Sequence, residues 1–193
     1  TWLQDANYAQ TSGFSGTGLM NWSQATNWAA NLSYFDSVRN VTWNDWRLPS
    51  IQDTGIVGCD FSYNGGDCGY NVNTATSEMA HLFHNELGDV ADYTTTGSSN
   101  PFAFGMEQGL FTNMQYGYYW SSMEDPQDVT TAWVFRFYTG NQQMYAKNYY
   151  YGLSAWAVRD GDVAAASTVP LPAAGWMFLS GLAGLVMQFR RRH

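Results

Sequence analysis

The chain has 193 residues, and its 8 basic and 16 acidic side chains give a formal net charge of −8. Three of the basic residues are the arginines near its end, so residues 1–163 carry 5 basic and 16 acidic residues, a net charge of −11. A negatively charged surface repels phosphates, which argues against nucleic acid as a partner. Aromatic residues make up 17% of the chain and charged residues only 12%, a balance typical of a loop-rich extracytoplasmic domain with a neutral, polar surface.

Two amphipathic helices are predicted in the first half of the chain. Apolar residues recur at helical spacing from Trp22 to Leu32, and Asn21 followed by Gln24 resembles a capping box. A second helical pattern runs from Ser77 to Leu87, with Gly88 as its expected stop. We expect the apolar faces of both helices to pack against one core.

A single arginine lies among aromatic and apolar residues between these two helices, in Trp46-Arg47-Leu48-Pro49. An arginine in such surroundings commonly stacks on an aromatic ring and hydrogen-bonds backbone carbonyls. We therefore interpret the segment as a structural core motif that fixes a buried loop, with ligand binding as the alternative.

The two cysteines, Cys59 and Cys68, flank a turn signal at Asn64-Gly65-Gly66, so their thiols can be brought together. We expect them to form a disulfide, because the end of the chain, described below, places this region in an oxidising compartment. A zinc site is the alternative, and it needs two further ligands. The histidines do not supply a recognisable ligand spacing, and we expect no metal site from them: His81, His84 and His193.

An antiparallel sheet is predicted for the second half of the domain. Residues 91–109 are rich in Thr, Ser, Gly and Asn, which indicates a long loop. Short runs of β-forming residues follow it, separated by turn signals such as Gly140-Asn141. The expected strands are Phe111–Met114, Tyr118–Ser122, Ala132–Tyr138, Gln143–Ala146 and Ala155–Arg159.

The end of the chain predicts one membrane-spanning helix. Residues 164–168 form a short linker, and the apolar residues 173–189 would reach roughly 26 Å as a helix, close to the thickness of the hydrocarbon core of a bilayer. The arginines after this segment stay in the cytoplasm by the positive-inside rule, which places residues 1–163 on the other side of the membrane. A buried core helix is the alternative, although it would carry three consecutive arginines at its end. Small residues offer a face for packing against another helix: Ser180, Gly181 and Gly184.

This tail, residues 169–193, resembles the VPLPA form of the PEP-CTERM sorting signal. Val169-Pro170-Leu171-Pro172-Ala173 matches the proline motif, residues 173–189 match the hydrophobic helix, and Arg190-Arg191-Arg192 matches the basic cluster. The resemblance implies a Gram-negative bacterial protein that crosses the inner membrane and is processed by exosortase, a membrane transpeptidase. It also implies a place in the periplasm or at the cell surface, often beside exopolysaccharide, with an inner-membrane anchor at least until the tail is processed.

Residues 1–163 resemble the Lcl C-terminal-type domain, which is named after a bacterial collagen-like adhesin. That family is similar to the C-type-lectin-like fold, so the resemblance implies an α+β domain in which two helices pack on a small twisted antiparallel sheet with long loops. The matching segments, in order, are Trp2-Leu3-Gln4-Asp5, Trp43–Ser50, Ser77–Gly88, Tyr119–Ser122, Ala132–Phe135 and Trp156–Arg159.

These patterns predict a non-enzymatic envelope or cell-surface module that binds glycan, such as exopolysaccharide, or an envelope protein. Aromatic side chains beside amides can stack on sugar rings and hydrogen-bond their hydroxyl groups, and residues 142–151 have that chemistry. Core packing is the alternative for each of these tyrosines. A second hypothesis is an accessory subunit of an inner-membrane protein complex, anchored by an uncleaved C-terminal helix. We expect no enzyme activity, because no Ser-His-Asp arrangement is evident.

One loop has the chemistry of a calcium site. Glu124, Asp125 and Asp128 carry the carboxylate oxygens that calcium takes as ligands. A solvated acidic turn is the alternative, and we expect no other cofactor.

Overall fold

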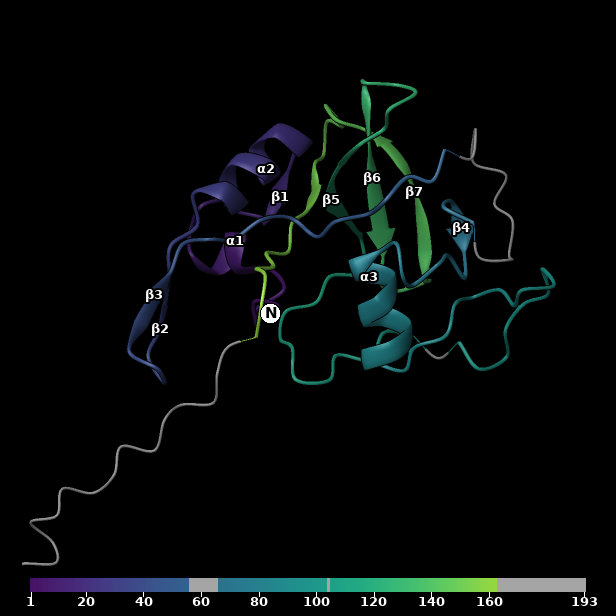
Figure 1. Cartoon of the computed structure of the whole chain (residues 1–193), viewed down its shortest axis with the longest axis horizontal. Helices are drawn as coiled ribbons and strands as arrows, with labels where there is room; N and C mark the ends of the chain where they lie inside the picture. The colour runs from purple at the N-terminus through teal and green to yellow at the C-terminus, as the bar shows by residue number, and fades with distance from the viewer. Residues whose placement is uncertain (56–65, 104, 163–193) are drawn as a thin grey trace, which may run out of the picture.

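The computed structural model describes residues 1–55, 66–103 and 105–162, which form a few helices packed against one larger sheet (Figure 1). Neighbouring strands of the sheet are antiparallel, except that β5 and β8 pair in parallel. A separate hairpin of β2 (Tyr34–Asp36) and β3 (Val41–Trp43) projects from the body at the lower left of Figure 1. The six strands of the sheet lie in the order β1 (Leu19–Met20), β8 (Leu153–Ser154), β5 (Tyr118–Glu124), β6 (Thr131–Arg136), β7 (Asn141–Ala146) and β4 (Gly69–Tyr70).

Both predicted helices are present. Helix α2 (Trp22–Ala30) begins with the expected capping box, in which the Asn21 side chain accepts from Gln24 N at 2.9 Å and the Gln24 side chain accepts from Asn21 N at 3.0 Å. Helix α3 (Glu78–His81) continues into a π-helix, η1 (Leu82–Glu86), and Gly88 follows with a φ of 73°. Helix α1 (Tyr8–Thr11), a single turn, was not predicted.

Two of the expected strands are wrong. Phe111–Met114 makes one isolated bridge, at Thr112, and Ala155–Arg159 makes two, both from Val158, to Trp2 and to Arg47. Residues 155–158 are all buried, because this segment crosses the core between the N-terminal segment and residues 46–49. The apolar run that suggested a strand therefore reflects burial on all sides. The short strands β1, β2, β3, β4 and β8 were not expected.

Two tryptophans at the centre of the core tie the N-terminal segments to the sheet. Trp120 and Trp156 have no exposed area. Trp156 Nε1 donates to Leu3 O at 2.7 Å, and Trp120 Nε1 donates to Met20 O at 2.8 Å. Each indole thus buries a large apolar surface while its N–H group keeps a hydrogen-bond acceptor, which avoids the cost of an unpaired buried donor.

The turn between β6 and β7 requires glycine at position 140. Gly140 has a φ of 69°, and its N–H group donates to Arg136 O at 2.9 Å. A Cβ at this position would lie 2.7 Å from the Phe83 ring and 2.9 Å from Ala91 Cβ, closer than carbon atoms approach without displacement. Gly140 therefore fixes where β6 ends and β7 begins, with Arg136 opposite Asn141.

The proposed linker and membrane helix, residues 164–168 and 173–189, lie outside the described residues. Within the part of the chain that the structure describes, no helix is long and apolar enough to cross a membrane.

Gly140→Ala is expected to lower the free energy of unfolding by about 1–3 kcal/mol, because the added methyl group must displace Phe83 while the backbone stays in a left-handed conformation. Urea unfolding followed by circular dichroism measures the change. Gly16→Ala is the matched control, because an added Cβ there has no heavy atom within 4 Å. Equal stability of the two variants would contradict the requirement for glycine at position 140.

Candidate functional site

Three neighbouring strands carry tyrosines and an arginine on the face of the sheet away from α3. Residues opposite one another in a ladder share a face, as do alternate residues along a strand. Tyr118 of β5 lies opposite Arg136, and Tyr145 of β7 lies opposite Ala132, four residues before Arg136 on β6. The intervening Phe135 belongs to the other face, where its ring contacts Phe83 of η1. Tyr118, Arg136 and Tyr145 therefore lie together on the outer face.

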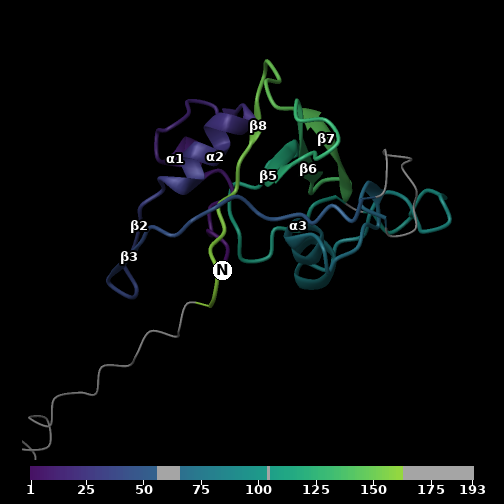
Figure 2. The ribbon, with the colours of Figure 1, turned by 45° about the horizontal axis from the view of Figure 1, so that its top comes forward.

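Seven tyrosines form a row in two parts, which starts on this face and continues into the β7–β8 connection. We call it the tyrosine row. Neighbouring ring centroids lie 5.0 to 5.8 Å apart, and Arg136 joins the two parts of the row. The β7–β8 connection, residues 147–152, rises above the sheet at the top of Figure 2, whereas α3 lies below the sheet. The order of the row is Tyr116, Tyr138, Tyr118, Tyr145, Tyr149, Tyr151 and Tyr150.

The central rings of the row meet over β6. The backbones of Tyr118 and Tyr145 are separated by two strand spacings across the sheet, roughly 10 Å, and by four residues along β6, roughly 13 Å. Their ring centroids are only 5.4 Å apart. The two rings therefore lean toward each other across Val134, which has no exposed area although it lies on this face. The centre of the row is thus part of the packed fold, and this packing orients its rings.

The two ends of the row are exposed. The exposed fraction is 90% for Tyr150 and 70% for Tyr151 at one end, and 65% for Tyr116 and 41% for Tyr138 at the other. Tyr119, a true core tyrosine, has no exposed area. Core packing therefore does not explain the four terminal tyrosines of the row.

A hollow of about 340 Å³ lies at one end of the row, between the β7–β8 connection and the start of α2. Its lining includes Tyr149–Tyr151 and the side chains of Asn21, Gln24 and Asn148. Asn21 and Gln24 each use the amide oxygen in the capping box, so the NH₂ group is the part of each amide that can serve a ligand. A polar hollow with amide donors at this end of the row suits a ligand rich in hydroxyl groups.

Arg136 is held against the row by its neighbours. Its Nε donates to Tyr116 O at 3.0 Å, and Cζ of the guanidinium lies 5.6 Å from the Tyr118 ring centroid and 5.7 Å from that of Tyr138. Both distances fall within the range of cation–π attraction. Burial raises the pKa of the Tyr118 hydroxyl, and the positive charge of Arg136 opposes this rise only in part. Tyr118 therefore stays neutral at physiological pH, and Arg136 is the charged group at this point of the row.

The acidic loop considered for calcium is internally paired. Glu124 forms an ion pair with Lys147, whose Nζ also lies 4.5 Å from the Trp22 ring centroid. Asp125 accepts hydrogen bonds from Gln127 N and Thr131 Oγ1, and Asp128 accepts two from Thr130. Among the described residues, no group of three or more His, Cys, Asp and Glu side chains could hold a metal ion.

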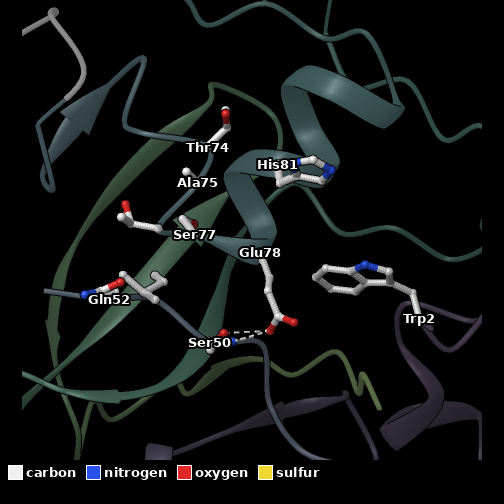
Figure 3. A pocket seen from close by; sticks show the side chains of 10 residues that line it. Trp2, Ser50, Gln52, Thr74, Ala75, Ser77, Glu78 and His81 are labelled. Atoms are coloured by element: carbon white, nitrogen blue, oxygen red, sulfur yellow. Dashed lines mark hydrogen bonds between the residues drawn. The ribbon is translucent and has the colours of Figure 1, made fainter. Parts of the chain in front are cut away.

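A second hollow, of about 430 Å³, lies on the other side of the domain (Figure 3). Figure 3 shows the Trp2 ring facing Glu78 and His81 across the opening. Glu78 Oε2 accepts hydrogen bonds from Ser50 N and Ser50 Oγ at 2.6 and 3.0 Å. Burial raises the pKa of Glu78, but the hydrogen bonds from Arg47 and Ser50 outweigh burial and leave it below its ordinary value. Glu78 is thus an ionised group that is already bound to the protein.

Arg47 joins three segments beside this hollow. Its guanidinium donates to both carboxylate oxygens of Glu78 at 2.7 and 2.9 Å and to Asp160 at 2.5 Å. It also donates to Leu48 O at 3.1 Å, so a backbone carbonyl is one partner, but the main partners are carboxylates rather than the expected carbonyls and ring. The flanking residues of the motif are buried: Trp46, Leu48 and Pro49.

Other residues singled out in the sequence fall partly outside the described chain. Cys68 is disulfide-bonded, and Cys59 lies outside the described residues. His81 is exposed, whereas His84 is half-buried with Nδ1 3.1 Å from Asp89 O. The proposed tail residues also lie outside the described part: Val169, Pro170, Leu171, Pro172, Ala173, Ser180, Gly181, Gly184, Arg190, Arg191 and Arg192.

Asp89 is a buried carboxylate beside the end of η1. Both of its oxygens lie 3.2 Å from the N–H group of Glu107, and its exposed fraction is 7%. Burial raises the pKa of Asp89 to about 6, with a further contribution from the nearby Glu107 charge. Folding therefore makes Asp89 harder to ionise than an ordinary aspartate.

Asp89→Asn is expected to be more stable than the wild type at pH 7, by about 1–2 kcal/mol, and equally stable near pH 4. Because the pKa of Asp89 is higher in the folded state than its ordinary value of 3.8, its contribution to stability is complete below pH 3.8 and is lost as the pH rises through about 6. Urea unfolding of both proteins from pH 4 to 7.5 measures the difference. A difference that does not change with pH would contradict the raised pKa.

Only one part of the row was predicted from the sequence. Residues 142–151 contain Tyr145, Tyr149, Tyr150 and Tyr151, but not the other three tyrosines or Arg136. Strand register places the other three tyrosines and Arg136 beside them. The turn signal at Gly140-Asn141 could have predicted that register.

Comparison with models of known families, with curated proteins and with solved structures gives no match to this chain.

Proposed function

We propose that this chain is a non-enzymatic, exported module that binds an extended polysaccharide along the tyrosine row. The observation that carries the proposal is the row itself: a pair of rings and a run of five rings, joined by Arg136, exposed at both ends and ordered by packing at the centre. A row of this kind matches a ligand that is itself long and repetitive. A compact small molecule would need one enclosed pocket instead.

The chemistry of tyrosine suits such a ligand. Each ring offers a flat apolar face on which the C–H groups of a sugar can stack, and each hydroxyl group can exchange hydrogen bonds with sugar hydroxyls. Tyrosine also loses little conformational freedom on binding, because its side chain has few rotatable bonds. The hollow beside Tyr149–Tyr151 adds amide donors at one end, where a terminal sugar would fit.

The disulfide bond of Cys68 supports export, because disulfides persist in oxidising compartments such as the bacterial periplasm and the cell surface. We place the domain outside the inner membrane of a Gram-negative bacterium, with residues 169–193 as a tail for exosortase. Exopolysaccharide, often present beside proteins with such tails, is then the class of ligand within reach.

The arrangement of helices, sheet and long loops also supports a relationship to C-type-lectin-like domains. Helices α2 and α3 pack on one twisted sheet, and a connection of about 30 residues, along the α3 side of the molecule, joins the end of η1 to β5. The proposed ligand surface uses the sheet and the β7–β8 connection. It does not depend on a metal.

Replacement of the two most exposed rings, Tyr150→Ala with Tyr151→Ala, is expected to weaken polysaccharide binding about tenfold, because two stacking surfaces are lost. The full chain is titrated against a panel of soluble neutral and acidic polysaccharides by isothermal titration calorimetry. Phe35→Ala is the control, because Phe35 is an exposed aromatic residue of the β2–β3 hairpin, away from the row. The proposal fails if no polysaccharide binds, or if the double variant binds as tightly as the wild type.

A further inference from the structure

Arg136 differs from the other basic residues of the domain. Within the residues that the structure describes, it has no acidic partner, and it lies against two tyrosine rings instead. Because carboxylates far outnumber basic groups in this domain, an arginine without a carboxylate partner is unexpected. The other basic residues are all in ion pairs: Arg39 with Asp36, Arg47 with Glu78 and Asp160, Lys147 with Glu124, and Arg159 with Asp45.

The surroundings of Arg136 make it a fixed and partly dehydrated charge. The side chain is half-buried, and Nε is bound to Tyr116 O. Of the five N–H donors of the guanidinium, one is used by Tyr116 O and one serves the Tyr118 hydroxyl, which leaves further donors on the terminal nitrogens for a carboxylate. A partly buried cation has lost part of its hydration, and contact with an anion compensates for that loss. Arg136 therefore has the position and the geometry to receive a carboxylate from a ligand.

Asp92 is the acidic side chain that lies close enough to affect Arg136. Burial raises the pKa of Asp92, and the charge of Arg136 opposes this rise only in part. The two side chains form no ion pair in the described structure, and the backbone of Asp92 is held by a hydrogen bond to Thr139 O. Asp92 therefore does not neutralise Arg136 through an ion pair.

We propose that the tyrosine row recognises an acidic polysaccharide, in which the carboxylate of a uronic acid unit pairs with Arg136 while neighbouring sugar rings stack on the tyrosines. This inference rests on the proposed function and adds the class of sugar. Arg136 lies between the two parts of the row, so the carboxylate is bound where sugar rings on both sides can be stacked. Lys147, the other basic residue near the row, is neutralised by Glu124.

The net negative charge of the domain opposes an acidic ligand mainly at long range. At physiological ionic strength, exposed charges separated by more than about 8 Å are largely screened. A carboxylate in direct contact with Arg136 is much closer than that, and the contact is partly shielded from water. The ion pair between Arg136 and the ligand carboxylate, rather than the net charge of the domain, therefore determines the preference for an acidic sugar.

The test uses pairs of polysaccharides that differ only in charge. Homogalacturonan and its fully methyl-esterified form share one backbone, and glucuronan and a cello-oligosaccharide of equal length form a second pair. The full chain is titrated with each ligand by calorimetry at about 0.15 M salt. In the pair whose backbone fits the row, the acidic member is expected to bind about tenfold more tightly than the neutral member.

Arg136→Gln is expected to bring the two members of that pair within about twofold of each other. Arg39→Gln is the matched control: it removes one positive charge from the β2–β3 hairpin and should leave the preference unchanged. Arg136→Lys retains the charge without the paired N–H groups and should give an intermediate preference. This second variant keeps the test decisive if Arg136→Gln does not fold.

The outcomes separate this inference from the proposed function. If the wild type binds the acidic and neutral members equally, the acidic ligand class is wrong and polysaccharide binding stands. If the preference persists in Arg136→Gln, the role of Arg136 is wrong. If no member of either pair binds and the wider panel also gives no binding, both the inference and the proposed function are overturned.

Discussion

The close approach of Gly140 to Phe83 is the constraint on which the outer face of the sheet depends. Because no Cβ fits at this point, the turn between β6 and β7 stays at Gly140, and Arg136 stays opposite Asn141. A shift of one residue along β7 would turn Tyr145 toward the core and bring Gln142 or Met144 to the surface. The packing of Gly140 against Phe83 of η1 thus determines which side chains are exposed on the face of the sheet away from α3.

Tryptophan and phenylalanine supply most of the large buried rings of this chain, and Tyr119 is the one buried tyrosine among the described residues. Phenylalanine and tryptophan fill the core, where Trp120 and Trp156 donate their N–H groups to backbone carbonyls. Tyrosine dominates the outer surface, where its hydroxyl group can remain hydrated while its ring covers apolar atoms such as those of Val134. This division explains how a chain with 17% aromatic residues can keep a large aromatic surface exposed and still be polar at that surface.

Local signals in the sequence predicted local structure well. The capping box at Asn21 and Gln24 and the stop at Gly88 are present, because each depends on residues within one helical turn. The strand expected at Ala155–Arg159 is wrong, because an apolar run reads the same whether it lies in a ladder or crosses the core. Whether this segment forms a strand depends on its contacts with Trp2 and Arg47, which are distant in the sequence.

The candidate site was predictable only in part for a similar reason. Four tyrosines within residues 142–151 stand out as a cluster in the sequence, but Tyr116, Tyr118, Tyr138 and Arg136 join them through strand pairing. The unpaired state of Arg136 could not be predicted at all, because it becomes visible only once the partners of the other basic residues are known.

The position of the chain ends determines how a load would pass through the domain. Thr1 and Gly161 are joined by hydrogen bonds, and this junction lies on the side of the molecule remote from the β7–β8 connection in Figure 2. A polymer held at the tyrosines and a tether attached after Asp162 would therefore pull from opposite poles. The last described segment is fastened by the bridges from Val158 to Trp2 and Arg47, with the Arg47–Asp160 and Arg159–Asp45 ion pairs beside them. The anchored end of the chain and the proposed binding surface are thus separate parts of the fold.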